Sequence, residues 1–235
     1  QYITSNDVSK ILVGQAQYTY LPNYNGGIVD DCLLYMISSN TYMLVVNASN
    51  IKKTISWINQ HNTFNCIIND QSDNYSLLAI QGPKSRNLLQ EITNENLADI
   101  NYYEFKIMTV AGIDNIIVSR TGYTGEIGFE LYIKNKHVKL IWEAICTTSI
   151  NIKPIGLAAR NTLRLEKGFC LYGNDIDENT CPIEAGLGWI TKFTKNFINY
   201  KTLKSRKEGS LSKKLVGLEL IDKGIARKNY LIFSN

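Results

Sequence analysis

Three runs rich in β-branched and aromatic residues follow one another near the start of the chain, and short turns separate them. They cover residues 15–21, 28–37 and 42–46, and the first run ends at Pro22 and the turn Asn25-Gly26-Gly27. Runs of this length predict β-strands, and an Asn-Gly turn predicts a tight reversal. The second and third runs, joined by only a few polar residues, predict a hairpin. An antiparallel sheet is therefore the first expectation for this chain.

The rest of the chain mixes helical and strand patterns without a strict strand–helix–strand alternation. Apolar residues at helical spacing predict helices after the caps Ser5-Asn6-Asp7 and Asn47, after Gly82-Pro83, and over residues 138–145 and 157–165. Short β-branched runs predict strands over residues 66–68, 77–80, 105–110, 113–119 and 129–133, and another beginning at 215–221. Hairpins interleaved with helices in this way predict an α+β fold with mixed, largely antiparallel sheets and flanking helices.

Length and composition exclude several classes of protein. The chain has 235 residues, of which 44% are hydrophobic and 20% charged, a balance typical of one large or two small folded domains. No apolar run approaches the ~18–20 residues of a membrane span. The net charge of +4 fits an anionic small molecule or an acidic protein partner, and the pI near 8.7 is below that of a typical nucleic-acid domain. We therefore expect neither nucleic acid nor a membrane as a partner.

Cysteine and histidine usage limits the metal and redox chemistry. The chain has two histidines and five cysteines, and no two cysteines stand in a C-x-x-C pair. This pattern argues against a zinc ribbon, a three-histidine metal site and a disulfide framework. We expect no metal site, and reduced, mostly buried thiols in an intracellular protein. The first residue is Gln1, not Met, which predicts either a processed start or a piece of a longer chain.

Two adjacent acids interrupt the second apolar run. In Ile28-Val29-Asp30-Asp31 the carboxylates lie inside a predicted strand, just after the Gly26-Gly27 turn. Successive side chains of a strand face opposite sides, so we expect one acid to point inward and the other toward solvent. A carboxylate inside an apolar strand needs a partner, which leaves two interpretations. The inward acid either holds a turn or an arginine, or serves as a general base or cation-stabilising group in a pocket.

A glycine-rich segment, residues 120–130, reads Arg-Thr-Gly-Tyr-Thr-Gly-Glu-Ile-Gly-Phe-Glu. Its glycine spacing, and the strand predicted after it, do not match the dinucleotide-binding loop, which runs from a strand into a helix. We expect instead a corner that lets a ligand approach the backbone, with Tyr123 available for stacking. Glu130 has two interpretations: a bidentate partner for adjacent N–H donors of an aminopyrimidine-type ring, or an ordinary surface glutamate.

A third candidate segment is the predicted helix after Gly156. Small residues at 156, 158 and 159 predict close helix packing, from which Arg160 could reach an anion or a carbonyl, although a purely structural role is the alternative. Arg164 and Glu166 are expected to face solvent. Farther on, a run of basic residues flanks Gly209 and predicts either a solvated face or a docking patch: Lys201, Lys204, Arg206, Lys207, Lys213 and Lys214.

Taken in order, six segments of the chain resemble the aminomethyltransferase (T-protein) family of the glycine cleavage system. The segments are Gly26-Gly27-Ile28-Val29-Asp30-Asp31, Leu78-Ala79-Ile80-Gln81-Gly82-Pro83, and residues 121–130, 156–166, 171–178 and 182–189. The resemblance runs over essentially the whole chain. The chain is shorter than members of this family, so we expect it to be a fragment that lacks both ends.

The resemblance implies two ferredoxin-like, folate-binding subdomains. We expect residues 1–205 to form this folate-binding region, with the two subdomains intertwined and divided near residues 75–100. Residues 206–235 are expected to be a linker and the truncated start of a C-terminal β-barrel domain. The resemblance also implies a location in the cytoplasm of a bacterium, or in the mitochondrial matrix of a eukaryote.

The same resemblance implies a tetrahydrofolate-dependent transfer. Lipoylated H-protein of the glycine cleavage complex carries an aminomethyl group, and the enzyme moves its one-carbon unit to the co-substrate tetrahydrofolate. The products are 5,10-methylenetetrahydrofolate, ammonia and dihydrolipoyl H-protein. Asp30 matches the family's catalytic aspartate. By the same match Glu130 is expected to hold the pterin edge and Arg160 to contact folate, with Tyr123 and Asn47 as pocket walls.

A non-catalytic folate-binding protein of the tRNA-modification and iron–sulfur assembly type is the main alternative. Its hallmark K-G-C-x-x-G-Q-E is not matched, because Lys167-Gly168-Phe169-Cys170 has an extra residue before the cysteine and Gln-Glu is missing. A folate-binding or interaction module without any activity is a second alternative, since one fold hosts many functions. The sequence favours the transferase.

Overall fold

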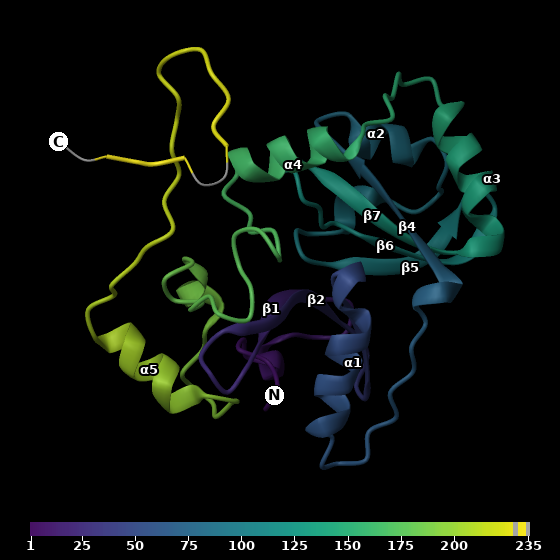
Figure 1. Ribbon diagram of the computed structural model, residues 1–235. Helices are drawn as coiled ribbons and strands as arrows, with labels where there is room; N and C mark the ends of the chain where they lie inside the picture. The colour runs from purple at the N-terminus through teal and green to yellow at the C-terminus, as the bar shows by residue number, and fades with distance from the viewer. Residues whose placement is uncertain (228–229, 234–235) are drawn as a thin grey trace.

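The computed structural model describes residues 1–227 and 230–233, and within them it contains two antiparallel β-sheets (Figure 1). The first sheet has three strands in chain order: β1 (Ala16–Pro22), β2 (Ile28–Ser38) and β3 (Thr41–Val45). The second has four, in the spatial order β4 (Tyr75–Gln81), β7 (Gly128–Lys134), β6 (Ile113–Ser119) and β5 (Phe105–Val110). The expected combination of helices with antiparallel sheets is confirmed.

Helices flank both sheets in the part of the chain that the structure describes. The α-helices are α1 (Ile51–Gln60), α2 (Ser85–Gln90), α3 (Asn135–Cys146), α4 (Leu157–Glu166) and α5 (Tyr200–Glu208). Short 3₁₀ turns cover Val8–Lys10, Ala48–Asn50, Ser72–Asn74, Leu97–Asp99 and Leu187–Ile190. In Figure 1, α2 and α3 lie beside the second sheet, whereas α1 lies near β2 of the first.

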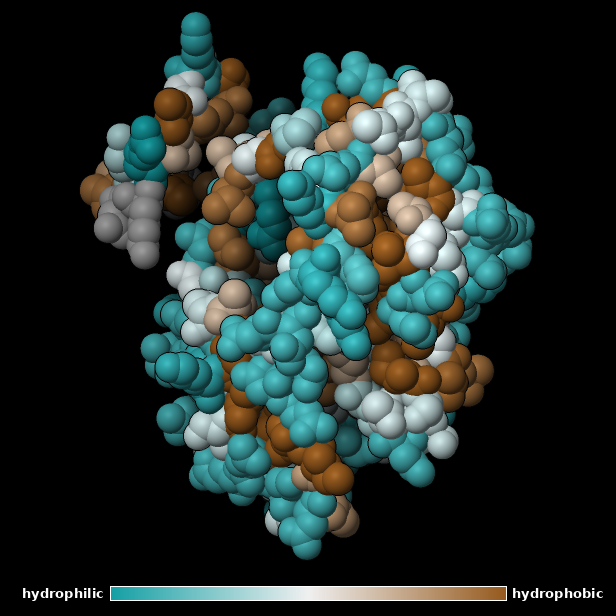
Figure 2. All heavy atoms as spheres, turned by 90° about the vertical axis from the view of Figure 1, so that its right-hand side faces the viewer, coloured by the Kyte–Doolittle hydropathy of each residue, from teal (hydrophilic) through white to brown (hydrophobic). Residues whose placement is uncertain are grey.

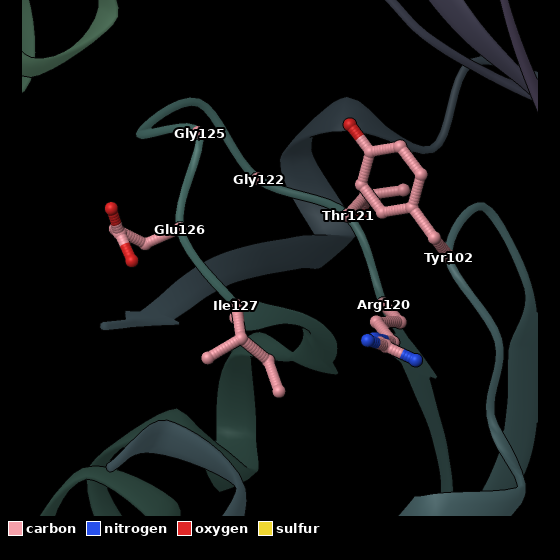
Figure 3. A pocket seen from close by; sticks show the side chains of 8 residues that line it. Tyr102, Arg120, Thr121, Gly122, Gly125, Glu126 and Ile127 are labelled. Carbon is pink, nitrogen blue, oxygen red and sulfur yellow. The ribbon is translucent and has the colours of Figure 1, made fainter. Parts of the chain in front are cut away.

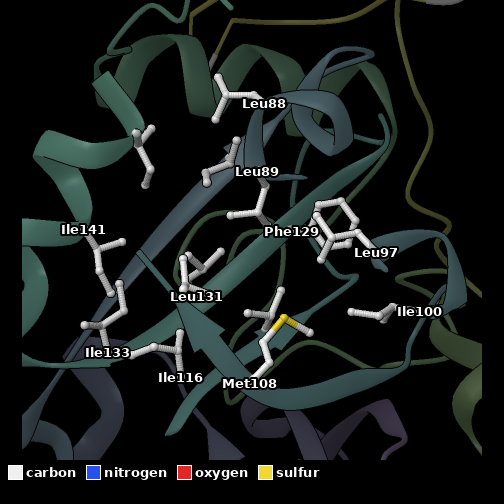
Figure 4. Close-up of a cluster of buried hydrophobic side chains, with 14 residues drawn as sticks. Leu88, Leu89, Leu97, Ile100, Met108, Ile116, Phe129, Leu131, Ile133 and Ile141 are labelled. Atoms are coloured by element: carbon white, nitrogen blue, oxygen red, sulfur yellow. The ribbon is translucent and has the colours of Figure 1, made fainter. Parts of the chain in front are cut away.

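One face of the second sheet forms the main core together with α2 and α3 (Figure 4). The side chains of Phe129, Leu131 and Ile133 alternate along β7 onto this face and are fully buried. Ile141 of α3 packs against them. Burying each such side chain stabilises the fold by roughly 1.5–3 kcal/mol. The alternate residues of β7, among them Glu130, therefore face the other way.

The opposite face of the second sheet packs against the first sheet. Tyr132 of β7 lies in a cluster with Tyr35 of β2 and Phe105 of β5, and the hydroxyl oxygens of Tyr35 and Tyr132 are 2.9 Å apart. The strand register pairs Glu130 with Ala79 of β4, on the same face as Tyr132. Glu130 therefore points from β7 toward the side on which the first sheet lies.

The outer surface of α3 is mixed in character. Leu140 and Trp142 are about half exposed, at 53% and 45%. Figure 2, turned to view the side of the molecule on the right of Figure 1, shows hydrophobic groups interspersed with hydrophilic ones over this side. Within the described residues, every helix is too short or too polar to cross a membrane.

Two predicted strands and one predicted helix differ from the structure. Residues 66–68 form a loop, because the Asn62 side chain hydrogen-bonds both the backbone nitrogen and the carbonyl oxygen of Cys66. Residues 215–221 have a strand-like pattern but pair with no strand among the described residues, and their side chains are exposed. After Asp7 the chain makes a single 3₁₀ turn, Val8–Lys10, which is shorter than the predicted helix.

The described residues do not confirm the expected start of a C-terminal barrel. From residue 209 onward, the described residues contain neither helix nor strand. The start of a barrel domain after residue 206 and the division of residues 1–205 near 75–100 stay predictions. Residues 228–229 and 234–235, which belong to the same predicted region, lie outside the described residues.

Candidate functional site

Asp30 is fully buried on β2, where its carboxylate accepts hydrogen bonds from the segment that leads into α1. Oδ1 accepts from the side-chain amides of Asn47, at 2.8 Å, and Asn50, at 2.6 Å. Oδ2 accepts from the backbone nitrogen of Asn47, at 3.1 Å, and the hydroxyl of Thr54, at 3.3 Å. In all four contacts the carboxylate acts as an acceptor, as an ionised carboxylate must. The inward acid of the pair is thus held by neutral donors and does not hold an arginine.

Asp31 is half-buried, so the expectation that the second acid faces solvent is wrong. Its Oδ2 accepts a 2.8 Å hydrogen bond from the hydroxyl of Tyr18, and its Oδ1 accepts a 2.9 Å bond from the Asn47 amide. Burial raises the pKa of Asp31, and the charge of Asp30 raises it further, although the two donors oppose the shift. The Asn47 amide nitrogen therefore bridges the two carboxylates.

The residues that hold Asp30 share a spacing that the sequence prediction missed. Asn47, Asn50 and Thr54 stand three and four positions apart, the spacing of one helix face. Asn47 and Asn50 belong to the 3₁₀ turn before α1 and its cap, and Thr54 lies in the first turn of α1. Polar residues on the face of a helix that meets an acidic strand could have signalled this arrangement. The sequence reasoning followed only the apolar stripe of the same helix.

The turn before β2 is held in place by contacts with a loop from much later in the chain. A Cβ added to Gly27 would overlap the carbonyl group of Glu178, so only glycine fits there. Tyr172 donates a 2.9 Å hydrogen bond to the carbonyl oxygen of Ile28 and accepts one of 2.7 Å from Lys53. Lys53 also forms a 3.0 Å ion pair with Glu178. The loop around residues 172–178 is therefore fixed to the strand that carries both acids.

The glycine-rich corner accommodates side chains of the chain itself. A Cβ at Gly122 or Gly128 would overlap the side chain of Gln81, whose amide nitrogen donates to the carbonyl oxygens of Thr121 and Phe129, at 3.2 and 3.3 Å. At these two glycines the missing side chain makes room for Gln81, whereas a ligand was expected to approach the backbone there. A cavity of about 220 Å³ opens beside the same corner (Figure 3). Its lining is Tyr102, Arg120, Thr121, Gly122, Gly125, Glu126, Ile127 and Gly128.

Glu130 is half-buried, which removes the surface-glutamate alternative. Its Oε2 accepts a 2.5 Å hydrogen bond from the Thr121 hydroxyl. Burial raises the pKa of Glu130, while the Thr121 hydrogen bond and the positive charge of Arg160 act in the opposite direction. A carboxyl group in this position is poised to accept N–H donors from a ligand that enters beside it.

Arg160 and Tyr123 meet beside Glu130. Arg160 is exposed on α4, and its guanidinium carbon lies 4.5 Å from the centre of the Tyr123 ring. Tyr123 also stacks on Phe169, with ring centres 5.9 Å apart, and donates a hydrogen bond to the carbonyl oxygen of Cys170. Burial raises the pKa of Tyr123 to about 12. The structure thus brings Glu130, Arg160 and Tyr123 into one neighbourhood, and places Asn47 against Asp30.

Two expectations for α4 are wrong. Arg164 does not face solvent: it is 2% exposed, forms an ion pair with Asp175 and donates to Asn161 and to the carbonyl oxygen of Phe169. It therefore holds the loop on which Tyr123 rests. The small residues at 156 and 158 are exposed rather than closely packed, and a Cβ at Gly156 would meet no atom within 4 Å.

Potential metal ligands do not gather anywhere in the described part of the chain. No group of three or more histidine, cysteine, aspartate or glutamate side chains there is arranged to hold an ion. The five cysteines are unpaired; Cys32, Cys170 and Cys181 are buried, and Cys66 and Cys146 are exposed.

Known proteins match this chain over most of its length. The family model described as the GCVT N-terminal domain matches residues 1–195. Proteins named aminomethyltransferase from Flavobacterium psychrophilum and Bacteroides fragilis are each 53% identical over 234 residues, 99% and 98% of this chain. The chain spans 65% of the length of these relatives. The crystal structure of the glycine cleavage system aminomethyltransferase T from Bartonella henselae is 31% identical and superposes with a TM-score of 0.79, over 88% of this chain and 57% of that one.

The matches agree with the motif order and with the fold. The alternative of a folate-binding protein of the tRNA-modification type finds no support among these relatives. The chain belongs to the aminomethyltransferase family that carries the GCVT N-terminal domain.

Proposed function

We propose that the whole protein transfers a one-carbon unit from the aminomethylated lipoyl arm of H-protein to tetrahydrofolate. The products are 5,10-methylenetetrahydrofolate, ammonia and dihydrolipoyl H-protein. The observation that carries the proposal is the buried Asp30 carboxylate, which neutral donors hold in place beside a second acid, in a chain of this family.

Asp30 suits the charge that such a reaction develops. When ammonia departs from the aminomethyl carbon, the carbon becomes cationic, and a fixed carboxylate stabilises that charge strongly in a site with little water. The four donors to Asp30 come from α1 and the turn before it, so the carboxylate need not reorganise during the reaction. In this proposal Asn47 orients both acids, a more specific role than that of a pocket wall.

The folate site in this proposal lies beside Glu130. Its carboxyl group would pair with the adjacent N–H donors of the pterin ring in a bidentate contact. On the same face of the sheet, Ala79 of β4 pairs with Glu130 and is exposed, and Leu77 is 42% exposed. These two side chains offer an apolar surface for a flat ring. Arg160 above Tyr123 would contact the anionic part of the folate.

The basic helix α5 is the proposed contact for H-protein. Lys201, Lys204 and Lys207 are exposed. The Arg206 guanidinium lies 2.9 Å from the position that a Cβ of Gly26 would occupy, so α5 adjoins the turn that leads to the two acids. An acidic carrier protein bound there would be close to the proposed reaction centre. We expect the affinity for this carrier protein to fall steeply as the salt concentration rises. An affinity independent of salt would mean that these lysines form only a solvated face.

The proposal includes the cytoplasm of a bacterium as the location. It rests on the bacterial sources of the relatives, such as Flavobacterium psychrophilum and Bacteroides fragilis.

The test of the function is a stoichiometric assay on the full-length protein. Aminomethylated H-protein and tetrahydrofolate are supplied, and ammonia and methylenetetrahydrofolate are measured over time. We expect the two products to form in equal amounts and to require both substrates. Folate binding without tetrahydrofolate-dependent ammonia release would refute the transferase and support the non-catalytic alternative.

A further inference from the structure

Both backbone hydrogen-bonding groups of Ile28, the first residue of β2, bond to the later loop. Its nitrogen donates a 3.0 Å hydrogen bond to the carbonyl oxygen of Asp177, and its carbonyl oxygen accepts one of 2.9 Å from the Tyr172 hydroxyl. The register of the β1–β2 ladder is irregular at this end of the strand. The position of the beginning of β2, two residues before Asp30, therefore depends on the loop around residues 172–178.

Tyr172 also contacts α1, the helix at whose beginning the donors to Asp30 stand. Its hydroxyl oxygen accepts a 2.7 Å hydrogen bond from the ammonium group of Lys53, which lies 4.5 Å from the centre of the Tyr172 ring. An ammonium group only donates, so the hydroxyl proton of Tyr172 remains available for the carbonyl oxygen of Ile28. Lys53, Tyr172 and Ile28 thus form a chain of two hydrogen bonds from α1 to β2.

This chain of hydrogen bonds joins the same two elements as the hydrogen bonds to Asp30. Thr54, which donates to Asp30, follows Lys53 directly on α1. Asn50, another donor, is the N-cap residue of the same helix. A displacement of α1 relative to β2 changes the donor distances to Asp30 and the distance from Lys53 to Tyr172 together. The two sets of contacts therefore restrain the same separation.

The ammonium group of Lys53 suits a fixed contact. Burial lowers the pKa of Lys53, but its hydrogen bonds to Tyr172 and Glu178 outweigh this effect and raise that pKa above its ordinary value. A charged donor forms a stronger hydrogen bond than a neutral one. The Glu178 side chain is 57% exposed, and ion pairs with exposed partners contribute little. The hydrogen bond to Tyr172 is therefore the contact through which Lys53 restrains the loop.

We propose that Lys53 is a positioning residue for the transfer, which acts through Tyr172 to keep the donors at the beginning of α1 in register with the Asp30 carboxylate. This inference rests on the proposed function, in which Asp30 stabilises the developing positive charge. A carboxylate stabilises such a charge best when it is already in place and does not reorganise during the step. Lys53 and Tyr172 contact neither substrate in this proposal. They affect the rate of the chemical step and not the binding of folate.

The first test is Lys53→Met in the full-length protein, which keeps an unbranched side chain and removes the ammonium group. Ammonia release from aminomethylated H-protein is measured with saturating tetrahydrofolate, at a temperature at which circular dichroism shows each variant folded. Misplacing a reacting group by about 1 Å costs about 10²-fold in rate, so a partial loosening is expected to lower kcat at least about tenfold. The dissociation constant of tetrahydrofolate, from calorimetry, is expected to stay within about threefold, the pattern of a contribution made only in the transition state.

Lys52→Met is the matched control. Lys52 precedes Lys53 on α1 and is exposed, so removing its ammonium group leaves the contacts of Tyr172 and Glu178 undisturbed. Its kcat is expected to equal that of the wild type. A fall in kcat equal to that of Lys53→Met would show a general effect of charge on this helix and overturn the role of Lys53.

A second variant breaks the chain of hydrogen bonds at its middle. Tyr172→Phe keeps the ring and removes the hydroxyl that contacts both Lys53 and Ile28. We expect kcat to fall by a similar factor. In the double variant the two losses are not expected to multiply, because each substitution breaks the same chain. A merely structural role would lower the unfolding temperature of both variants and leave kcat unchanged below it.

The outcomes separate this inference from the proposed function. An active wild type with Lys53→Met at wild-type kcat overturns the role of Lys53 and leaves the proposed function standing, as does a double variant whose loss is the product of the two single losses. If Lys53→Met fails to fold, Tyr172→Phe at wild-type kcat overturns that role. A wild type that releases no ammonia with tetrahydrofolate refutes the proposed function, and the inference with it.

Discussion

Replacing Arg164 with alanine is expected to destabilise the protein by about 3–5 kcal/mol, the usual cost of removing one partner of a buried ion pair. Arg164 is 2% exposed, and its partner Asp175 is 18% exposed. In the variant the Asp175 carboxylate keeps its hydrogen bond from the Leu171 backbone nitrogen, at 3.0 Å, but has no positive partner. The carbonyl oxygen of Phe169 also loses the guanidinium donor, a contact of 3.0 Å. An unsatisfied buried group alone costs about 1–3 kcal/mol.

Urea unfolding of the full-length protein, followed by circular dichroism, measures this loss. With a slope of about 1–3 kcal/mol per molar urea, a loss of 3 kcal/mol lowers the midpoint by roughly 1–3 M. Lys139→Ala is the control, because its ion pair with Glu143 is 3.9 Å long and 85% and 55% exposed, and such pairs contribute little. A midpoint for Arg164→Ala no lower than that of the control would refute the reasoning that this buried pair holds the loop under Tyr123.

Three further predictions concern the site. Gly27→Ala is expected to lower the free energy of unfolding by at least about 1–3 kcal/mol in a calorimetric scan, because the added methyl group overlaps the Glu178 carbonyl. Gly156→Ala is the control: its methyl group meets no atom within 4 Å, so this variant should unfold like the wild type. Asp30→Asn is expected to abolish methylenetetrahydrofolate formation while tetrahydrofolate affinity changes by less than about tenfold, or ~1.4 kcal/mol; unchanged turnover would contradict the assignment. Burial raises the pKa of Glu130, so the protonated carboxyl group stabilises the folded state, and this stabilisation is lost as pH rises above 4.5. Glu130→Gln should therefore gain stability relative to the wild type as pH rises. Parallel profiles of unfolding free energy against pH would contradict this.

The strands could be predicted from the sequence because their signals are local. Alternation and turn chemistry placed β1, β2 and β3 to within a residue or two, and the later strands followed from the same rule. Residues 215–221 show where this reasoning ends. Their pattern is as strand-like as the others, but a strand needs a ladder partner, and a partner is a property of the whole fold.

The site could be predicted only in part, for a related reason. The position of Asp30 in an apolar strand predicts its burial. The partners of Asp30 lie on α1 and the turn before it, and only the polar helical spacing of these partners, which the sequence reasoning did not use, could have predicted them. Arg164 was expected at the surface because arginine usually lies there, and the carboxylate that buries it stands eleven residues later. Asp31 was expected in solvent because strand alternation specifies opposite faces but not what covers each of them.

The loop around residues 172–178 contacts Gly27 and Ile28, and these contacts affect the order in which the chain folds. The hydrogen bond from Tyr172 to Ile28 joins residues 144 positions apart, and the one from Asn23 to Glu178 joins residues 155 apart. During synthesis, β1 and β2 can pair as soon as both have emerged, but the turn between them stays open until the ribosome has delivered residue 178. Contacts between distant residues also form late in refolding, because closing a long loop is entropically costly. The nascent protein therefore carries two paired strands whose connecting turn is held in place only after the loop around residues 172–178 has been translated.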